Sequence, residues 1–243
     1  MDIRVSKVSK SFDQKQVIKD ITFTIPSEEI CCLLGPSGSG KTSLIRLMIG
    51  AITADQGTIQ FEDVQMPNMN MLKEVGFMPQ NDALYDDLSA EANLQFFGGL
   101  YKIEKRKLEK RIDEVLSIVD LIEHRKKLVK HFSGGMKKRL SLAAAILHSP
   151  KVLFLDEPTV GIDPVLRRKI WDQFQVIKNA GATIVVSTHV MDEVTECDKA
   201  ALIYNGSLIE YDAVANLLKK TENGRVEELF FIASSELKGG AVQ

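Results

Sequence analysis

A glycine-rich segment ending in a lysine and a threonine has the spacing of a phosphate-binding loop. Residues 35–42 read Gly-Pro-Ser-Gly-Ser-Gly-Lys-Thr, an apolar run precedes them, and a helical pattern follows. Glycines allow consecutive backbone N–H groups to point at one anion, and a helix N-terminus adds partial positive charge. We therefore expect Lys41 to contact the β- and γ-phosphates of a nucleotide and Thr42 to hold Mg²⁺.

Two carboxylates stand at the end of a second apolar run. Residues 152–155 are continuously apolar, as in a strand buried on both faces of a parallel sheet, and Asp156 and Glu157 follow. Ligands bind at the carboxyl ends of such strands. We expect Asp156 to hold Mg²⁺ and Glu157 to accept a proton from an attacking water or to orient it. The pair alone also suits a simple cap before Pro158, but the phosphate loop favours the catalytic interpretation.

A third motif combines a capping residue with two glycines. Ser133 is a good N-cap, Gly134 and Gly135 follow it, and a helix is predicted from there to Pro150. Glycine-exposed amides at a helix N-terminus form a second potential anion site. The alternative is an ordinary capped helix.

The elements that must hold these motifs follow an α/β pattern. Residues 3–30 predict antiparallel strands, and short apolar runs at 58–61, 75–78, 152–155 and 183–187 predict further strands. Residues 89–130 are helical and highly charged, which indicates a solvated helix face. An apolar stripe at helical spacing lies within them: Leu108, Ile112, Val115, Leu116 and Val119. Alternating buried strands and helices predict a doubly wound, mainly parallel sheet.

The composition excludes several function classes. The chain has 243 residues and a net charge of −2, so there is no basic field to attract nucleic acid. Cys31 and Cys32 lie in an apolar run and Cys197 stands alone, which fits a reduced cytosolic setting and no disulfide framework. The N-terminus shows no signal peptide, and no stretch approaches the ~20 apolar residues that span a bilayer. Any work at a membrane therefore requires a partner that crosses it.

Taken together, the motifs resemble the nucleotide-binding domain of an ATP-binding cassette (ABC) transporter over nearly all of residues 1–212. Ser133-Gly134-Gly135 matches the family's signature motif and precedes Asp156 by 23 positions. Gln80 matches the Q-loop glutamine, Asp163 the D-loop aspartate and His189 the switch histidine. These motifs occur in the order that the family has.

Two positions depart from the family pattern. Met136 stands where the signature usually ends in Gln, so an amide contact is lost while Ser133 and the glycine amides remain. Phe12 stands where a Tyr usually stacks on adenine, and it keeps the stacking face without the hydroxyl. We interpret both as variations within a working site.

The resemblance implies a fold and a domain organisation. The fold is an α/β P-loop NTPase core with a mainly parallel sheet, an N-terminal antiparallel β subdomain and an α-helical subdomain. The ATP-binding domain is expected over residues 1–212, with the helical subdomain at about 84–148 inserted in it. Residues 213–243 are expected to form a small C-terminal extension that is helical from Ala213 and ends in a frayed tail around Gly239-Gly240.

The resemblance also implies the ligands, ATP and Mg²⁺, and the residues that contact them. Glu157, His189 and Gln80 are the expected catalytic residues, and Thr42, Gln80 and Asp156 the expected metal contacts. The expected nucleotide contacts are Phe12, Gly35, Pro36, Ser37, Gly38, Ser39, Gly40, Lys41, Thr42, Ser43, Ser133, Gly134, Gly135 and Asp163.

Two partners are implied as well, and neither is a nucleic acid. The first is a second nucleotide-binding subunit, either another copy, which we expect, or a related subunit. It is arranged so that Ser133 and Gly135 of one subunit face the ATP held by Lys41 of the other. The second is a separate transmembrane permease, which holds the chain, soluble when isolated, at the cytoplasmic face of the cell membrane. The permease is expected to dock near residues 80–97, where some apolar side chains form either a groove or core: Leu84, Tyr85, Leu88, Phe96 and Phe97. The short stretch from Gln80 to Ser133 and the sequence of residues 159–164 resemble exporters of drugs, polysaccharides and lipids.

Two other function classes compete with this interpretation. One is a soluble cassette ATPase that acts on ribosomes or nucleic acid. Translation-factor members resemble two cassettes in one chain, whereas this chain holds one. Chromosome and repair members carry long coiled coils between the phosphate loop and the signature motif. Here Lys41 and Ser133 are 92 positions apart, which is too short for such an arm. The other class is a regulator that binds nucleotide without turnover, and the presence of Glu157 and His189 argues against it.

Overall fold

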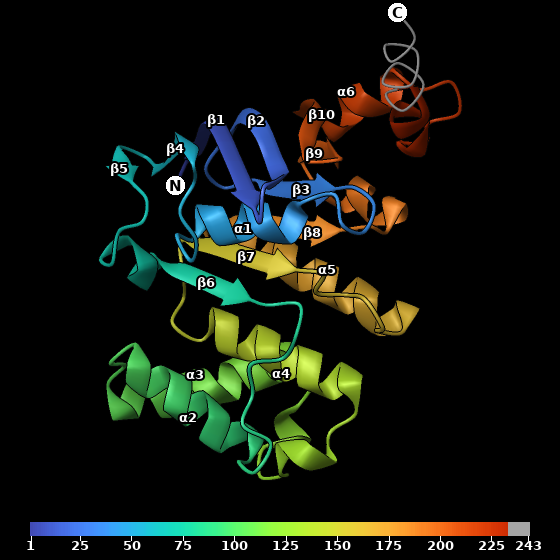
Figure 1. Cartoon of the computed structure of the whole chain (residues 1–243). Helices are drawn as coiled ribbons and strands as arrows, with labels where there is room; N and C mark the ends of the chain where they lie inside the picture. Colours follow the sequence, from blue (N-terminus) through green and yellow to red (C-terminus); the bar gives the residue numbers. More distant parts are fainter. Residues whose placement is uncertain (233–243) are drawn as a thin grey trace, which may run out of the picture. The chain divides into compact units, whose positions relative to one another are not determined.

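A computed structural model describes residues 1–232 and divides the chain into two compact units (Figure 1). Unit 1 comprises Met1–Asn68 and the described residues from Val185 onward, and unit 2 comprises Met69–Ile184. The boundary falls inside strand β8, Thr183–Thr188. The domain boundaries expected near residues 84, 148 and 212 stay predictions. The frayed tail expected around Gly239-Gly240 lies outside the described residues.

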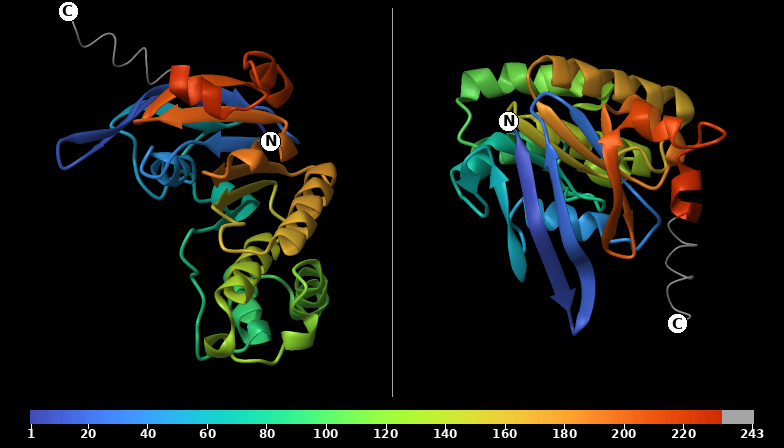
Figure 2. Two further views of the ribbon diagram at one scale, coloured as in Figure 1. Left: turned by 90° about the vertical axis from the view of Figure 1, so that its right-hand side faces the viewer. Right: turned by 90° about the horizontal axis from the view of Figure 1, so that it is seen from above.

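The N-terminal strands of unit 1 form the predicted antiparallel sheet. Its strand order is β2-β1-β4-β5, and the bounds are β1 (Ile3–Phe12), β2 (Lys15–Ile25), β4 (Gln56–Phe61) and β5 (Val64–Gln65). Figure 2 shows β1 and β2 as a long hairpin. On β2, Ile21, Phe23 and Ile25 are buried while the threonines between them are exposed, as the alternation predicts.

The other strands of unit 1 carry the phosphate-binding segment. Strand β3 (Ile30–Leu34) is buried along its whole length and pairs in parallel with β9 (Lys199–Tyr204). Strand β10 (Ser207–Ala213) runs antiparallel to β9. Helix α1 (Lys41–Met48) follows β3, and helix α6 (Val214–Lys219) follows β10. A buried strand that leads into a helix is the context that the motif requires.

All three cysteines are buried in unit 1. Burial of Cys31 and Cys32 confirms the sequence-based interpretation, and burial raises the pKa of the Cys31 thiol. Cys197, isolated in the sequence, is buried too, and its contact with Cys32 together with burial raises its pKa. Because only the thiolate is reactive, these side chains act as small apolar packing groups.

Unit 2 contains two parallel strands and four helices. Strand β6 (Val75–Met78) pairs with β7 (Val152–Asp156). The helices are α2 (Ala90–Leu100), α3 (Lys105–Ile118), α4 (Gly134–Ile146) and α5 (Pro164–Asn179). Short 3-10 helices occupy Met71–Glu74, Ile122–His124 and Val129–His131, and unit 1 has one at Met191–Glu196. The predicted apolar stripe of α3 is buried, and the charged residues around it are exposed except for Arg111, which is partly buried.

Helix α4 is shorter than the sequence predicts. The prediction extends it to Pro150, but it ends at Ile146. The guanidinium of Arg111, on α3, donates hydrogen bonds to the carbonyls of Ile146 and Leu147 at 2.9 and 3.1 Å. These bonds satisfy carbonyl oxygens that lack intrahelical partners at a helix C-terminus, so a side chain from another helix stabilises the end there.

Among residues 1–232, no helix combines the length and the apolar character that crossing a bilayer would require.

Candidate nucleotide-binding and hydrolysis site

The phosphate-binding segment is folded around its own lysine. Lys41 is the first residue of α1, its side chain is 5% exposed, and its ammonium donates to the carbonyls of Gly35 at 2.7 Å and Pro36 at 3.0 Å. These bonds hold the ammonium inside the curve of residues 35–40. A buried cation that is already fixed against the backbone is positioned to attract phosphate oxygens.

The same segment leaves polar groups open to an anion. Helix α1 begins after Gly40, at φ 109°, and glycine has no side chain to cap the first amides. The Ser39 hydroxyl is buried and has no hydrogen-bond partner among the described residues. Buried polar groups are normally satisfied, so this cradle fits a ligand that brings acceptor oxygens.

The turn between β9 and β10 holds the phosphate-binding segment through a backbone hydrogen bond. Gly206, between β9 and β10, donates its N–H to the Ser39 carbonyl at 3.0 Å and accepts from the Lys19 N–H at 2.8 Å. Its φ is +82°, and a Cβ at this position would lie 2.3 Å from the Val17 carbonyl oxygen. Gly206 therefore has both a conformational and a steric reason to be glycine. The dipeptide Asn205-Gly206 between two strand-like runs is a local signal for a hairpin turn, but nothing in it predicts the contacts with Lys19 and Ser39, which are far away along the chain.

Phe12 ends β1 and presents a partly open aromatic ring. Its exposed fraction is 41%, and the ammonium of Lys10 lies 5.6 Å from the ring centroid. Asp55 accepts from that ammonium at 2.6 Å and from the Ser11 N–H at 2.7 Å. The hydrogen bond from Lys10 and the one from Ser11 lower the pKa of the Asp55 carboxyl. The ring is thus held from its own strand, with exposed surface that suits stacking on a base.

His189 follows β8 and is exposed. The Thr188 hydroxyl donates to the carboxylate of Glu193 at 2.6 Å and accepts from the Val190 N–H at 3.0 Å. Both bonds involve the Thr188 hydroxyl, and they tie the residue before His189 to the residues that follow it. Because Glu193 is buried, the turn that carries His189 is anchored to a buried side chain.

In unit 2, the two carboxylates end strand β7 as the sequence predicts. Asp156 is 1% exposed, whereas Glu157 is only partly buried. The side-chain amide of Gln80 donates to the Glu157 carboxylate at 3.0 Å. Glu157 has φ +52°, a left-handed conformation that is unfavourable for a residue with a Cβ. The structure therefore brings together two of the three predicted catalytic residues; the approach of Lys41 and His189 to them stays a prediction.

Lys138 is a contact of Glu157 that sequence reasoning missed. From α4, its ammonium donates to the backbone carbonyl of Glu157 at 2.9 Å. The residue lies in a charged run, Lys137-Lys138-Arg139, that reads as an ordinary helix surface. No local pattern distinguishes it from its neighbours, because its partner is 19 residues away.

The signature segment has the predicted cap. Ser133 is the N-cap of α4, and its hydroxyl accepts from the Met136 N–H at 3.3 Å. A Cβ built at Gly134 or Gly135 would meet no atom of the described residues within 4 Å. The packing of this chain therefore does not require these glycines. Asp163 is likewise an N-cap, of α5, and accepts from the Leu166 N–H at 3.0 Å.

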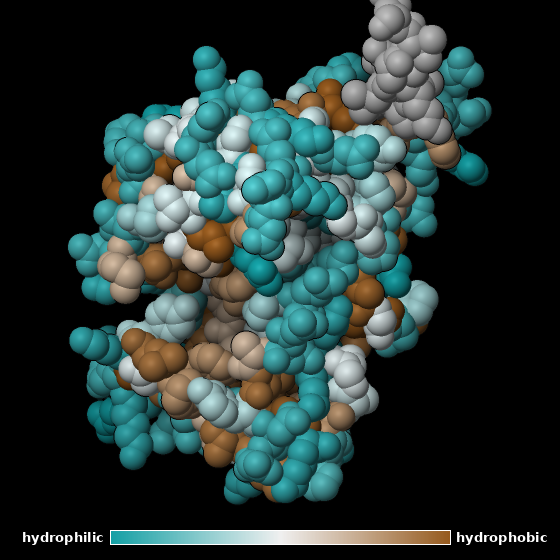
Figure 3. All heavy atoms as spheres, viewed as in Figure 1, coloured by the Kyte–Doolittle hydropathy of each residue, from teal (hydrophilic) through white to brown (hydrophobic). Residues whose placement is uncertain are grey.

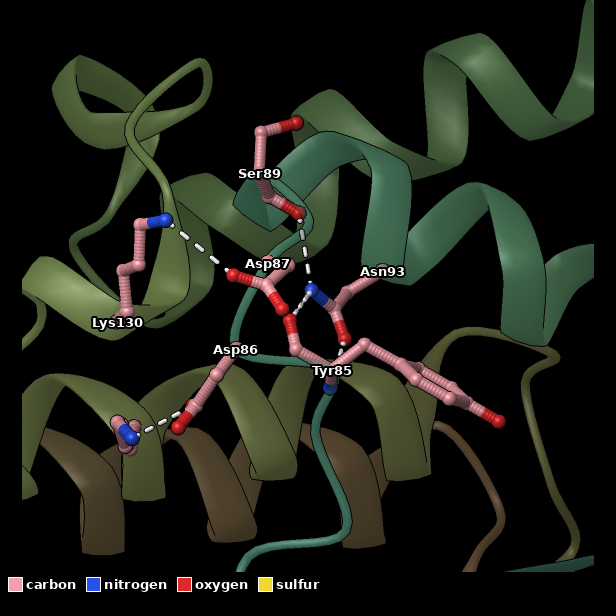
Figure 4. A network of polar contacts seen from close by, with 7 residues as sticks. Tyr85, Asp86, Asp87, Ser89, Asn93 and Lys130 are labelled. Atoms are coloured by element: carbon pink, nitrogen blue, oxygen red, sulfur yellow. Dashed lines mark hydrogen bonds and ion pairs between the residues drawn. The ribbon is translucent and has the colours of Figure 1, made fainter.

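The loop before α2 is held by a buried asparagine, also missed from the sequence (Figure 4). Asn93 accepts from the Tyr85 N–H at 2.8 Å and donates to the carbonyls of Tyr85 and Ser89, both at 3.0 Å. Tyr85 is 48% exposed, and its ring meets that of Phe96 edge-on at 4.7 Å between centroids. Phe97 is half-buried beside them, so the aromatic residues expected as groove or core lie at the surface. Figure 3 shows apolar side chains exposed in the region of α2 and its neighbouring helices.

The model of one protein family, described as ABC transporter, matches residues 18–160, which is more than half of the chain. The chain belongs to the ABC transporter family. The resemblance and the fold class expected from the sequence are therefore confirmed, and this ABC cassette is an ATP-binding and ATP-hydrolysing domain.

Individual relatives agree with this assignment. ABC transporter G family member 20 of Dictyostelium discoideum is 36% identical over 230 residues, which are 94% of this chain and 32% of that protein. Nod factor export ATP-binding protein I of Sinorhizobium fredii (strain NBRC 101917 / NGR234) is 38% identical over 210 residues, 85% of this chain and 61% of that protein. The chain thus spans about a third of the first relative and less than two thirds of the second.

A solved structure described as an ATP binding subunit of an ABC transporter superposes with a TM-score of 0.87. It covers 96% of this chain and 100% of its own, at 23% identity. At that identity the likeness supports the fold alone, the P-loop NTPase core with its accompanying β and helical parts.

Proposed function

We propose that this ABC cassette hydrolyses Mg²⁺-ATP to drive export through a separate membrane subunit. The observation that carries the proposal is the Gln80–Glu157 hydrogen bond at the end of β7, next to the buried carboxylate of Asp156. A cassette that only bound nucleotide would need no partly exposed carboxylate held there. The Sinorhizobium fredii relative is a Nod factor export ATP-binding protein by name, which supports the direction of transport.

Nucleotide binding is assigned to the unit 1 residues. The Lys41 ammonium and the loop amides of residues 35–43 bind the phosphates, and the exposed surface of Phe12 receives the adenine. The buried lysine and the unsatisfied Ser39 hydroxyl support the first assignment, and the exposed Phe12 ring supports the second. A phosphate chain would supply the acceptors that this cradle lacks.

The residues fit a magnesium ion as well. Thr42 offers a hydroxyl, Asp156 a buried carboxylate and Gln80 an amide oxygen, which are hard oxygen donors of the kind Mg²⁺ prefers. The described residues contain no cluster of three or more His, Cys, Asp or Glu that would hold a metal alone. Bound to those oxygen donors, Mg²⁺ would neutralise phosphate charge.

Hydrolysis is assigned to Glu157, with His189 and Gln80 in supporting roles. Glu157 accepts a proton from the attacking water or orients it, and Gln80 fixes the carboxylate. His189 contacts the γ-phosphate from its exposed position after β8. The hydrogen bond from Gln80 supports a defined direction for the carboxylate before the nucleotide arrives.

The signature segment supports a head-to-tail dimer with a second nucleotide-binding subunit. Gly134 and Gly135 meet open space, so their own chain gives no reason for the absence of a side chain. A close approach by a ligand from another subunit would explain why these positions lack a side chain. The phosphates of a nucleotide held by the partner would contact Ser133 and the glycine amides. Asp163 would connect the two sites. We infer a homodimer because this chain carries every residue of both half-sites.

The membrane subunit is assigned to the exposed aromatic surface formed by Tyr85, Phe96 and Phe97. The three hydrogen bonds of Asn93 hold the Tyr85 loop in place, so the surface is defined before a partner binds. Asp86 and Asp87 flank it and form ion pairs with Lys137 and Lys130. An apolar patch with a charged rim suits a short amphipathic helix. Docking there would keep the chain at the cytoplasmic face of the membrane.

The experiment is purification of the tagged chain from detergent-solubilised native membranes, with identification of stoichiometric partners. We expect a multi-span membrane protein, and its loss when Tyr85 and Phe96 are both changed to Ser. A Glu104→Gln variant, at the exposed N-cap position of α3, serves as control and should keep the partner. Recovery of the chain alone, or with ribosomes, would contradict the export proposal and favour a soluble cassette ATPase.

A further inference from the structure

The backbone of Glu157 is held by a residue that no part of the function above requires. Glu157 adopts φ +52°, and Pro158 follows it directly. A residue with a Cβ is disfavoured in the left-handed region, and a residue before proline is restricted as well. This conformation must therefore be maintained by contacts around it.

Lys138 supplies such a contact. Its ammonium donates to the Glu157 carbonyl at 2.9 Å, in a part-buried setting where a charge-assisted hydrogen bond is strong. Gln80 binds the same residue at its other end, 3.0 Å from the carboxylate. Glu157 is thus fixed at its backbone by one side chain and at its carboxylate by another.

We propose that Lys138 is a positioning residue for hydrolysis, which holds the Glu157 backbone in the left-handed conformation that aims its carboxylate. The inference rests on the proposed role of Glu157. The ammonium donates to the backbone carbonyl and takes up no proton in the reaction, so its effect on turnover is assigned to its hold on Glu157. Loss of its hydrogen bond frees the carbonyl to rotate, and the carboxylate moves away from the direction that Gln80 fixes.

A positioning role predicts an effect on turnover rather than on binding. The phosphates are assigned to the unit 1 loop and to the signature segment of a partner subunit, and Lys138 belongs to neither, so its removal should not change the affinity for ATP. The catalytic rate depends on sub-ångström placement of the carboxylate and should fall. Lys151, which precedes β7 at the end opposite to Glu157, is exposed and paired with Glu74 at 3.4 Å, and it provides a control cation in the same unit.

The test is steady-state ATP hydrolysis by the purified full chain. Lys138→Met should lower kcat about tenfold and leave KM within about twofold, Lys138→Arg should restore most of kcat, and Lys151→Met should match wild type. A Lys138→Met protein with wild-type kcat, or with an unchanged kcat and a raised KM, would overturn the proposal. If Lys138→Met does not fold, Lys138→Gln replaces it. Its shorter neutral side chain should also lower kcat at constant KM, and full turnover would overturn the proposal.

A double-mutant cycle with Glu157→Gln separates this inference from the proposed function. If Lys138 acts through Glu157, adding Lys138→Met to Glu157→Gln should not lower the residual rate further. A further tenfold loss would show that Lys138 acts elsewhere, and would overturn the inference while the role of Glu157 stood. If Glu157→Gln hydrolyses ATP at the wild-type rate, the proposed function itself fails.

Discussion

The side-chain amide of Gln80 lies 3.0 Å from the carboxylate of Glu157 and donates a hydrogen bond to it. Gln80 follows β6, and Glu157 follows the parallel neighbour β7, so the two residues leave the same edge of the sheet. Parallel pairing alone brings the ends of these strands together, and the hydrogen bond then gives the carboxylate one direction.

Replacement of Gln80 by Ala should therefore slow hydrolysis without preventing nucleotide binding. The carboxylate of Glu157 would lose a fixed donor, and we expect kcat to fall about tenfold at saturating ATP. Steady-state ATPase measurements with matched equilibrium binding would check this. Unchanged turnover would mean that the hydrogen bond has no part in catalysis.

Lys41→Ala should abolish measurable ATP binding. The change removes the buried cation and also frees the carbonyls of Gly35 and Pro36 that its ammonium holds. Isothermal titration calorimetry with Mg²⁺-ATP would measure the loss, with circular dichroism to confirm folding. Arg46→Met, an exposed cation on the same helix, is the control and should bind as wild type does. Tight binding by folded Lys41→Ala would refute the assignment.

Gly206→Ala should destabilise the chain and weaken ATP binding together. The added Cβ would lie 2.3 Å from the Val17 carbonyl oxygen, and the shift needed to relieve this contact would disturb the bond from Gly206 to Ser39. We expect a loss of about 2–4 kcal/mol in the free energy of unfolding, measured in urea. Gly224→Ala shares the positive φ but meets open space, so it should cost only about 1 kcal/mol. Equal costs would show that the close approach is unimportant.

Acid should destabilise the chain partly through His148. Burial lowers its pKa to about 4, and its Nε2 lies 3.0 Å from the Val75 carbonyl. The unfolded chain, where the pKa is about 6.5, binds the proton more readily. The stability that neutral His148 contributes is therefore complete above pH 6.5 and is lost as the pH falls towards 4. We expect about 1–2 kcal/mol, reduced from the full pKa difference because the ring is partly exposed.

Urea unfolding at pH 7.5 and 5.0 would measure this effect. His148→Phe keeps an aromatic ring against Tyr101, whose ring stacks on His148 at 3.7 Å between centroids. It should lose less stability than wild type between the two pH values, whereas His131→Phe, at an exposed position, should follow wild type. Identical losses in wild type and His148→Phe would contradict the assignment.

The sequence predicted the elements whose signals are local. The phosphate-binding segment, the buried run before Asp156 and the Ser133 cap all depend on residues adjacent in the chain, and the structure has each of them. The burial of α3 followed from helical spacing alone. Local patterns suffice where one element determines its own geometry.

Contacts between distant residues could not be predicted in this way. Lys138 and Asn93 contact the site or its surroundings, yet each looks ordinary among its neighbours in the sequence. Asn205-Gly206 is recognisable as a hairpin turn, but the hydrogen bond from Gly206 to Ser39 is not. The end of α4 at Ile146 has a local cause, since Pro150 has no N–H to donate to the Ile146 carbonyl, but the hydrogen bond that Arg111 supplies there instead comes from another helix. Such residues matter through partners that only the folded chain supplies.

The central claim is that Glu157 drives ATP hydrolysis in a cassette that closes around nucleotide. The most direct measurement compares wild type with Glu157→Gln for ATP turnover and for ATP-dependent dimerisation by size-exclusion chromatography. We predict that Glu157→Gln binds ATP, loses about 10²–10⁴-fold in kcat and accumulates as a dimer with ATP bound. Wild-type turnover by Glu157→Gln would remove Glu157 from the role assigned to it and contradict the account.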